Sequence, residues 1–159
     1  MSLELEMKRR LLQFNPPEAA AAAKIRRADT GEIRSYTEQA WRRYEQGIRV
    51  TPPEIMTWID SVLAWRDEMI DIWTTRLTSL PCNERHQFIW YELAKDWASL
   101  PDNDPSLWRP YQSVYLELML RYPDKVKFVR YSDSDYRSWL GRRKDTDSMR
   151  FEWACTKEA

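Results

Sequence analysis

Histidine and cysteine are scarce in this sequence of 159 residues, which has one histidine and two cysteines. A zinc site needs a full set of ligands at characteristic spacings, and His86 with Cys82 does not supply one. A nucleophilic triad needs a histidine positioned by an acid beside a nucleophile motif, and none surrounds His86. Cys82 and Cys155 lie in different regions of the chain, and no cysteine motif surrounds either. They do not make a disulfide framework, and we expect both to be free thiols. We therefore expect no metal and no cofactor, and we interpret His86 as a partly buried structural residue.

Glycine is also scarce, and long apolar stretches are missing. Gly31, Gly47 and Gly141 stand alone, which excludes a glycine-rich loop that cradles phosphate. No stretch approaches the roughly 18 uninterrupted apolar residues of a membrane span, and Glu4 and Glu6 stand where a signal peptide is basic. The formal net charge is zero, so no global field attracts nucleic acid or a membrane. These absences predict a cytoplasmic protein that is not an enzyme and has no membrane partner.

Tryptophan, by contrast, is abundant, with nine in the chain. Three of them, Trp58, Trp65 and Trp73, fall inside one uninterrupted helical pattern. Indole contributes large buried area but is neither acid, base nor nucleophile, so the excess indicates a core and recognition rather than chemistry. Scarce glycine and few β-branched runs favour helix over sheet. The predicted fold is mainly α, a single-domain helical bundle over residues 1–159.

Helix-start signals recur along the chain. Segments 15–18 and 51–54 each offer an N-cap, prolines in the first turn and a glutamate that complements the helix dipole. Segments 35–38 and 132–135 have the same spacing without proline, and a turn over 105–108 precedes another helix. The expected helices span residues 3–14, 16–28, 36–47, 52–79, 83–99, 109–122 and 133–144. Turns are expected at 29–32 and 101–104, a C-cap at Gly47, and a stop at Leu80-Pro81.

The helix at 52–79 is predicted to be central. Its apolar residues form two adjoining stripes that are wider than the face of a surface helix: Ile55, Trp58, Val62, Trp65, Met69 and Ile72, and beside them Ile59, Leu63, Ile70, Trp73 and Leu77. Helices 83–99 and 109–122 are also rich in apolar residues. Short loops between these three helices favour an antiparallel bundle.

Two short strand pairings remain as alternatives. Residues 24–27 and 32–36 could form a hairpin in place of the end of the second helix. Residues 126–131 and 149–156 alternate loosely and could form a small C-terminal β-ribbon, so that 145–159 is a ribbon or a tail.

Carboxylates also occur in pairs at helical spacing, Asp67 with Asp71 and Glu92 with Asp96. Dinuclear carboxylate sites need additional histidines, and acid–base catalysis needs carboxylates in apolar surroundings. We interpret both pairs as solvated helix faces.

Basic and aromatic side chains are interleaved in two segments, and these are the candidate partner-binding residues: Trp41, Arg42, Arg43, Tyr44, Tyr136, Arg137, Trp139, Arg142, Arg143 and Lys144. Arginine beside an exposed ring anchors protein interfaces, and it also grips phosphate while the ring stacks on a base. The alternative is that the rings face inward and the arginines form a solvated face. A nucleic-acid site would require the fold to bring both segments onto one face.

The first helix carries one narrow apolar stripe, Leu3, Met7, Leu11 and Phe14, among charged residues. This stripe either docks on the protein itself, which makes 1–14 a docking helix, or binds a partner or a second copy. The sequence as a whole predicts a non-catalytic protein-binding module, such as a regulatory, adaptor, inhibitor or assembly component, for example an accessory protein of a phage or mobile element. The alternative function is nucleic-acid binding through the arginine, tryptophan and tyrosine clusters. No protein family is indicated.

Overall fold

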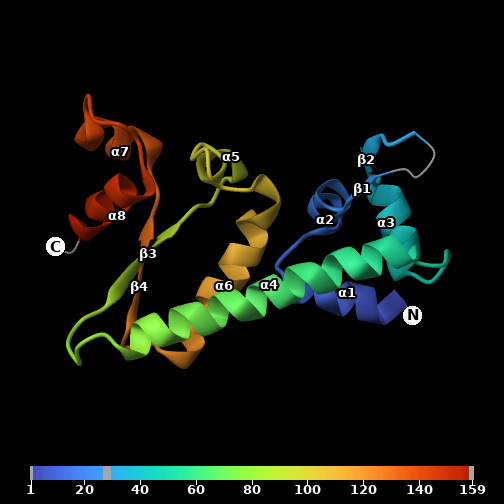
Figure 1. Ribbon diagram of the computed structural model, residues 1–159, viewed down its shortest axis with the longest axis horizontal. Coiled ribbons are helices and arrows are strands. Elements are labelled where there is room, and N and C mark those ends of the chain that lie inside the picture. Colours follow the sequence, from blue (N-terminus) through green and yellow to red (C-terminus); the bar gives the residue numbers. More distant parts are fainter. Residues whose placement is uncertain (1, 27–29, 158–159) are drawn as a thin grey trace. The chain divides into compact units, whose positions relative to one another are not determined.

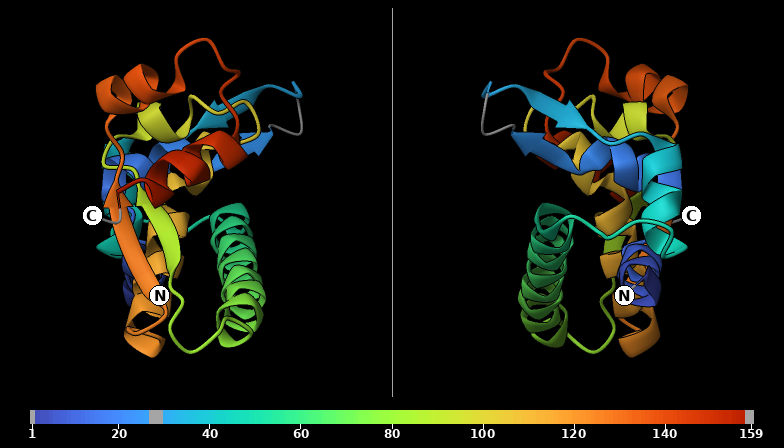
Figure 2. Two further views of the ribbon diagram at one scale, coloured as in Figure 1. Left: turned by 90° about the vertical axis from the view of Figure 1, so that its left-hand side faces the viewer. Right: turned by 90° about the vertical axis from the view of Figure 1, so that its right-hand side faces the viewer.

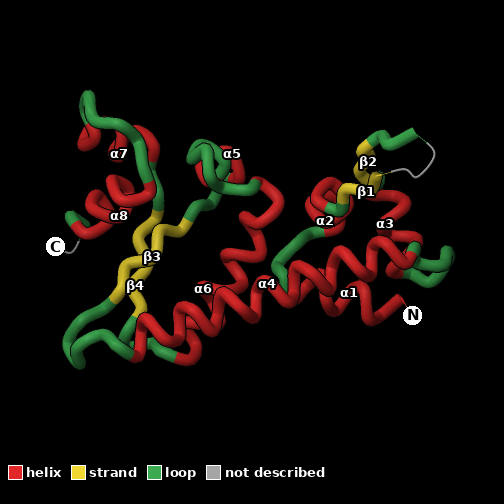
Figure 3. Tube along the Cα trace, viewed as in Figure 1, coloured by secondary structure: helices red, strands yellow, loops and turns green. Residues whose placement is uncertain are grey.

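The computed structural model describes residues 2–26 and 30–157, and helix is the dominant structure (Figures 1 and 3). The first elements are α1 (Ser2–Leu11), α2 (Pro16–Ala22), β1 (Lys24–Arg26), β2 (Ile33–Ser35), α3 (Glu38–Glu45) and α4 (Pro53–Thr78). They are followed by β3 (His86–Trp90), α5 (Ala94–Trp97), the 3-10 turn η1 (Pro105–Leu107), α6 (Trp108–Arg121), β4 (Val126–Arg130), α7 (Asp133–Leu140) and α8 (Asp147–Cys155). The predicted mainly α class is confirmed. Within the described ranges, no helix is long and apolar enough to cross a bilayer.

Two compact units make up the chain, and the boundary between them falls inside α4, after Glu68. We call residues 1–68 the N-terminal unit and residues 69–159 the C-terminal unit. Each is described by itself below. That the whole chain forms one domain stays a prediction.

Helix α4 is one continuous element, as its apolar stripes predicted. It begins at Pro53, where the amide of Ile55 donates to the carbonyl of Pro52 at 3.0 Å, so the expected cap at Thr51 lies one residue too early. Its buried apolar residues come from both predicted stripes and are Ile55, Ile59, Val62, Ile70 and Leu77; Arg66, which lies in neither stripe, is buried with them. Ile72 of the first stripe is exposed, so the buried face is narrower than the sequence predicted.

The N-terminal unit begins with two helices and a hairpin. Asn15 accepts a hydrogen bond from the amide of Glu18, whose carboxylate accepts one from the Asn15 amide, which is the capping box expected at 15–18. Helix α2 ends at Ala22, so the predicted helix over 16–28 is wrong at its C-terminal end. Strand β1 instead pairs antiparallel with β2, which confirms the alternative hairpin. The predicted helix over 16–28, the alternative hairpin and the turn expected at 29–32 each include part of 27–29. These three positions lie outside the described residues.

Helix α3 completes this unit. It begins at Glu38 with Thr37 as the N-cap, whose hydroxyl accepts from the amide of Ala40, two residues after the cap expected at Ser35. It ends before Gly47, whose φ of 71° is the left-handed conformation expected of a C-terminal glycine.

In the C-terminal unit, a β-α-β arrangement replaces the predicted bundle. Strands β3 and β4 are parallel and lie side by side, with His86 opposite Val126 and Trp90 opposite Arg130 (Figure 2). Helix α6 lies between them in sequence, as a crossover between parallel strands requires. The predicted helix over 83–99 is therefore wrong: only α5 within it is helical. Short apolar runs are ambiguous between strand and helix, and here the parallel partner decides.

The C-terminal ribbon is also corrected. Strand β4 lies where the sequence predicted one, but its partner is β3. Residues 147–155 form α8, which starts where the Thr146 hydroxyl accepts from the amide of Met149. Arg150, Trp153 and Ala154 of α8 are buried together, which is a helical spacing of three and four.

Arg150 stands at the centre of this unit, with none of its side chain exposed. Its guanidinium donates twice to Asp145, from Nε at 3.1 Å and from Nη2 at 2.9 Å. It also donates to the Tyr91 hydroxyl at 3.3 Å, the Asp96 carbonyl at 3.0 Å and the Ser99 hydroxyl at 2.7 Å. These bonds join α8 to the end of β3 and to α5, so the charge organises the core instead of facing a ligand.

Candidate functional site

The first predicted segment lies on α3, and its rings are not available to a partner. Trp41 is fully buried, its ring meets that of Trp58 edge-on at 6.1 Å, and its Nε1 donates to Glu45 at 2.7 Å. Tyr44 is also buried. The expectation that Trp41 offers an exposed ring is therefore wrong. The spacing of three between Trp41 and Tyr44 is the sequence signal for this inward face.

The charged residues of the same segment point outward. Arg42 is exposed and pairs with Glu38 at 2.7 Å, one helical turn away. Arg43 is half-buried. This segment therefore divides into an inward aromatic face and an outward basic face, which is the alternative that the sequence left open.

The second predicted segment begins on α7 and divides in the same way. Tyr136 is fully buried and donates its hydroxyl to Asp145 at 2.7 Å. Arg137 is exposed but is held by Asp133 at 3.3 Å and by Asp145 at 3.1 Å. Tyr136 is thus a core residue, and Arg137 is already occupied by acidic neighbours.

The end of α7 is different, and we call Trp139, Arg142, Arg143 and Lys144 the α7 basic end. Trp139 is half-buried, and the guanidinium of Arg143 lies 3.9 Å from the centre of its ring. Arg143 also donates to the Trp139 carbonyl at 2.5 Å. Arg142 and Lys144 are exposed, and in the described part of the chain neither forms an ion pair. This group presents basic charge next to a partly exposed ring.

The two predicted segments belong to different units, Trp41–Tyr44 to the N-terminal unit and Tyr136–Lys144 to the C-terminal unit. That they form one binding face stays a prediction.

Helix α1 docks on its own unit through a face that the sequence did not single out. Leu5 and Leu12 are fully buried, and Arg9 between them pairs with Glu45 of α3 at 2.5 Å. Arg9 also donates to the Phe14 carbonyl at 2.7 Å. A buried and doubly held arginine fixes the rotation of α1 about its axis, because a rotated helix would leave the buried charge without Glu45.

The predicted apolar stripe of α1 is therefore left in solvent. Leu3 is 66% exposed, Met7 60% and Leu11 49%, at successive spacings of four residues. Of the predicted stripe, only Phe14, beyond the end of α1, is buried, against Trp58 at 5.9 Å. The alternative that Leu3, Met7 and Leu11 dock on the protein itself is thus wrong. We call these three residues the α1 stripe.

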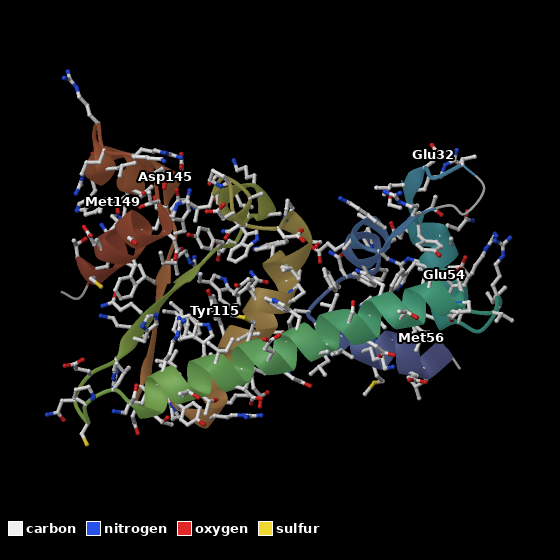
Figure 4. All side chains as sticks on the ribbon, viewed as in Figure 1. Glu32, Glu54, Met56, Tyr115, Asp145 and Met149 are labelled. Atoms are coloured by element: carbon white, nitrogen blue, oxygen red, sulfur yellow. The ribbon has the colours of Figure 1, made fainter. Side chains whose placement is uncertain are left out.

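The C-terminal unit contains a cavity of about 730 Å³, which lies among the end of α4, β3, α6 and α8. Aromatic rings are prominent in its lining. Tyr115 of α6, labelled in Figure 4, has its ring centroid 4.5 Å from that of Phe88 of β3. His86 lies in the wall, stacked on Phe151 at 5.1 Å. No sequence motif marks this cavity, because its residues come from segments far apart in the chain.

Electrostatics differ between the two ends of the cavity. Burial and the charge of Arg76 lower the pKa of His86, so its imidazole is neutral at neutral pH. Burial raises the pKa of Tyr115, and the negative charge of Asp147 raises it further. The phenol therefore remains protonated. Burial also raises the pKa values of Tyr91 and Tyr111, and the negative charge of Asp147 acts in the same direction on both.

The paired carboxylates are the remaining candidates for chemistry. In the described ranges, no group of three or more histidine, cysteine or carboxylate side chains is placed to hold a metal ion. Glu92 and Asp96 do not share a helix, because Glu92 precedes α5 and pairs with Arg130 at 3.2 Å. Asp67 and Asp71 are exposed on α4, as expected.

No model of a known protein family matches this sequence, and comparison with curated proteins gives no significant match.

Proposed function

We propose that this protein is a non-catalytic protein-binding module that acts through the α1 stripe. The observation that carries the proposal is the exposure of Leu3, Met7 and Leu11 on a helix whose opposite face is fixed by buried contacts. A rigid helix that presents apolar residues in one row is a common surface for helix–helix recognition. Held in this way, the row loses little conformational freedom on binding.

The occupant that the charges of α1 favour is a second copy of the chain. Met7 lies midway between Leu3 and Leu11, so two antiparallel copies place Leu3 opposite Leu11 and Met7 opposite Met7. In the same pairing each flank of the stripe meets the same flank of the other copy, so Glu4 lies near Lys8 of the other copy and Glu6 lies near its Arg10. A parallel pairing would instead align like charges. The antiparallel arrangement is the two-fold, self-complementary contact of most homodimers.

The size of α1 limits the strength of this contact. A ten-residue helix is about 15 Å long, and a single helix pair of this length buries less than the roughly 1,200 Å² of a stable standard interface. Lys8 and Arg10 also form ion pairs within their own chain: Lys8 with Glu4 at 2.7 Å and with Asp60 of α4 at 2.6 Å, and Arg10 with Glu6 at 2.6 Å. We therefore expect a reversible dimer with a dissociation constant on the order of micromolar or weaker.

Sedimentation equilibrium over a range of concentrations tests the proposal. The wild-type chain should show concentration-dependent dimerisation, and Met7→Glu should abolish it, because the substitution places two like charges at the two-fold axis. Val50→Glu is the matched control, since Val50 is 92% exposed in the same unit but lies outside the stripe. A wild-type chain that remains monomeric up to about millimolar concentration, or equal loss in both variants, would contradict the proposal.

A second candidate function is nucleic-acid binding, which the α7 basic end favours. Arg142 and Lys144 are exposed, and Arg143 is stacked on Trp139. Binding of a single strand should weaken with salt, with a slope of roughly −0.7 for each phosphate contact. Replacing Arg142 and Lys144 together by alanine should reduce the slope by about two contacts, whereas Lys95→Ala, an exposed lysine on α5, should leave it unchanged. The absence of oligonucleotide binding at low salt would exclude this function.

A further inference from the structure

The cavity of the C-terminal unit is walled by a continuous series of ring contacts. Eight aromatic or imidazole side chains line it: Trp73, His86, Phe88, Tyr91, Trp97, Tyr111, Tyr115 and Phe151. Each is in contact with the next in space, with centroid separations between 4.5 Å for Trp97–Tyr111 and 5.9 Å for Tyr111–Tyr115. Phe88, Tyr91 and Trp97 are buried behind the wall, and the other five rings are half-buried or exposed. Accessible electron-rich ring faces attract cations as well as apolar groups.

Two of these rings already have a guanidinium of the chain beside them. That of Arg150 lies 5.6 Å from the centre of the Tyr91 ring. The guanidinium of Arg76 lies 4.9 Å from the centre of the Trp73 ring. Among the described residues that line the cavity, Arg76 is the only basic one besides the neutral His86.

Three carboxylates stand at the rim, and they are not neutralised. Asp102, Asp147 and Glu152 line the cavity and are exposed. In the described ranges, none of the three forms a salt bridge. Because Arg76 is the single positive charge against three negative ones, the cavity has an acidic character. Anionic ligands are disfavoured there, and cationic ones are favoured.

We propose that this cavity binds a small organic cation, a substituted ammonium whose apolar body lies against the rings while its charge lies toward Asp147 and Glu152. The volume of about 730 Å³ falls within the range of small-molecule sites and exceeds the size of a bare ammonium, so the ligand carries a hydrocarbon or aromatic portion. Aromatic walls with carboxylates at the rim provide the two interactions such a ligand needs, cation–π attraction and charge neutralisation. This site is separate in residues from the α1 stripe and does not depend on it.

Three soluble probes of the same shape and different charge test the proposal by calorimetric titration of the full chain. Choline carries a positive charge, 3,3-dimethyl-1-butanol is its neutral isostere, and 3,3-dimethylbutyrate is an anion of similar shape. Choline should bind at least about threefold more tightly than the neutral probe, as expected for cation–π contacts, and the anion should bind least. Nuclear magnetic resonance of the indole N–H groups locates the site, because Trp97 and Trp73 should shift on addition of choline while Trp41 should not.

Substitutions at the rim distinguish binding in the cavity from nonspecific electrostatic attraction of choline to the protein surface. Asp147→Asn should weaken choline binding about twofold to fivefold, with little change for the neutral probe. Asp124→Asn is the matched control, because Asp124 is exposed in the same unit and does not line the cavity. Arg76→Gln should strengthen choline binding, since it removes the opposing charge. Circular dichroism of each variant verifies that the fold is retained.

The proposal is overturned by any of four results. These are no binding of choline at tens of millimolar, equal binding of the charged and neutral probes, tighter binding of the anion, and equal effects of Asp147→Asn and Asp124→Asn. Dimerisation through the α1 stripe is measured separately, so its failure leaves this site unaffected.

Discussion

Replacement of Arg150 by methionine should be among the most damaging single changes in the C-terminal unit. The guanidinium is completely buried and donates to Asp145, Tyr91, Asp96 and Ser99. Methionine fills similar space but leaves the Asp145 carboxylate without its main buried partner. Removing one member of a buried ion pair typically costs about 3–5 kcal/mol, because the remaining charge is left uncompensated. We expect a loss of that size in the free energy of unfolding.

The structure also provides a matched control, because Asp145 has a second arginine partner. Arg137 reaches the same carboxylate at 3.1 Å, but its side chain is 46% exposed. Solvent screens such a pair, so Arg137→Met should cost less than about 1 kcal/mol. Urea denaturation at neutral pH, followed by tryptophan fluorescence and far-ultraviolet circular dichroism, measures both values. Equal losses in the two variants, or a loss below about 1 kcal/mol for Arg150→Met, would refute the argument from burial.

The same pair predicts a dependence of stability on pH. The hydrogen bond from Arg150 lowers the pKa of Asp145 below its usual value, with further contributions from Tyr136 and Arg137. The contribution of Asp145 to stability is therefore present above the pKa of the unfolded state and is lost as the pH falls through the lower folded pKa. Arg150→Met should flatten this acid limb below about pH 4. An unchanged acid limb in the variant would contradict the assignment.

Three further predictions concern other sites. Glu45→Ala leaves the buried Arg9 without its carboxylate and should lower the free energy of unfolding, measured by urea denaturation, by about 3–5 kcal/mol. Glu38→Ala removes an exposed partner of Arg42 and should lower it by less than about 1 kcal/mol. Similar losses in the two variants would contradict the burial argument. Gln13 has a φ of 64°, so Gln13→Gly should raise the free energy of unfolding by up to about 1 kcal/mol, and a destabilised variant would argue against strain there. The lowered pKa of His86 means that the unfolded state takes up the proton first, so stability should fall as the pH decreases below about 6.5. His86→Phe should remove that part of the pH dependence in thermal unfolding, and its persistence would exclude His86 as the cause.

Local signals predicted the helices that are long or well capped. The capping box at Asn15 and Glu18 lies within four adjacent residues, and the apolar periodicity of α4 extends over several turns, so both are readable from the chain alone. Helix α7 begins after Ser132, as predicted, although the Ser132 side chain forms no capping hydrogen bond. These elements depend on neighbours in sequence, which is why their prediction succeeded.

The segment 83–99 shows where such signals are insufficient. Phe88 and Ile89 are apolar neighbours that suit a buried strand or a helix equally well. What decides is the parallel pairing with β4, whose residues lie about forty positions further along the chain. The opposite error occurred at residues 149–156, where loose alternation of apolar residues indicated a strand. This segment is largely helical, and Arg150, Trp153 and Ala154 share one buried face of α8.

The candidate sites show the same division. The sequence identified the basic and aromatic residues, but Trp41, Tyr44 and Tyr136 are in the core, and only contacts with distant residues make that choice. Arg9 is a similar case, because its burial against Glu45 selects which face of α1 docks and leaves the α1 stripe exposed.

The amino-acid sequence by itself determined the helical character of this protein, the position of α4 and the scarcity of residues for metal or nucleophilic chemistry, because composition, capping and periodicity are local properties. The tertiary structure decided which apolar and charged faces are buried, the β-α-β arrangement, and the aromatic cavity with its acidic rim. These depend on residues such as Trp73, Tyr115 and Asp147, which are far apart in the chain and meet only when non-local contacts outweigh the entropy of closing the loops between them.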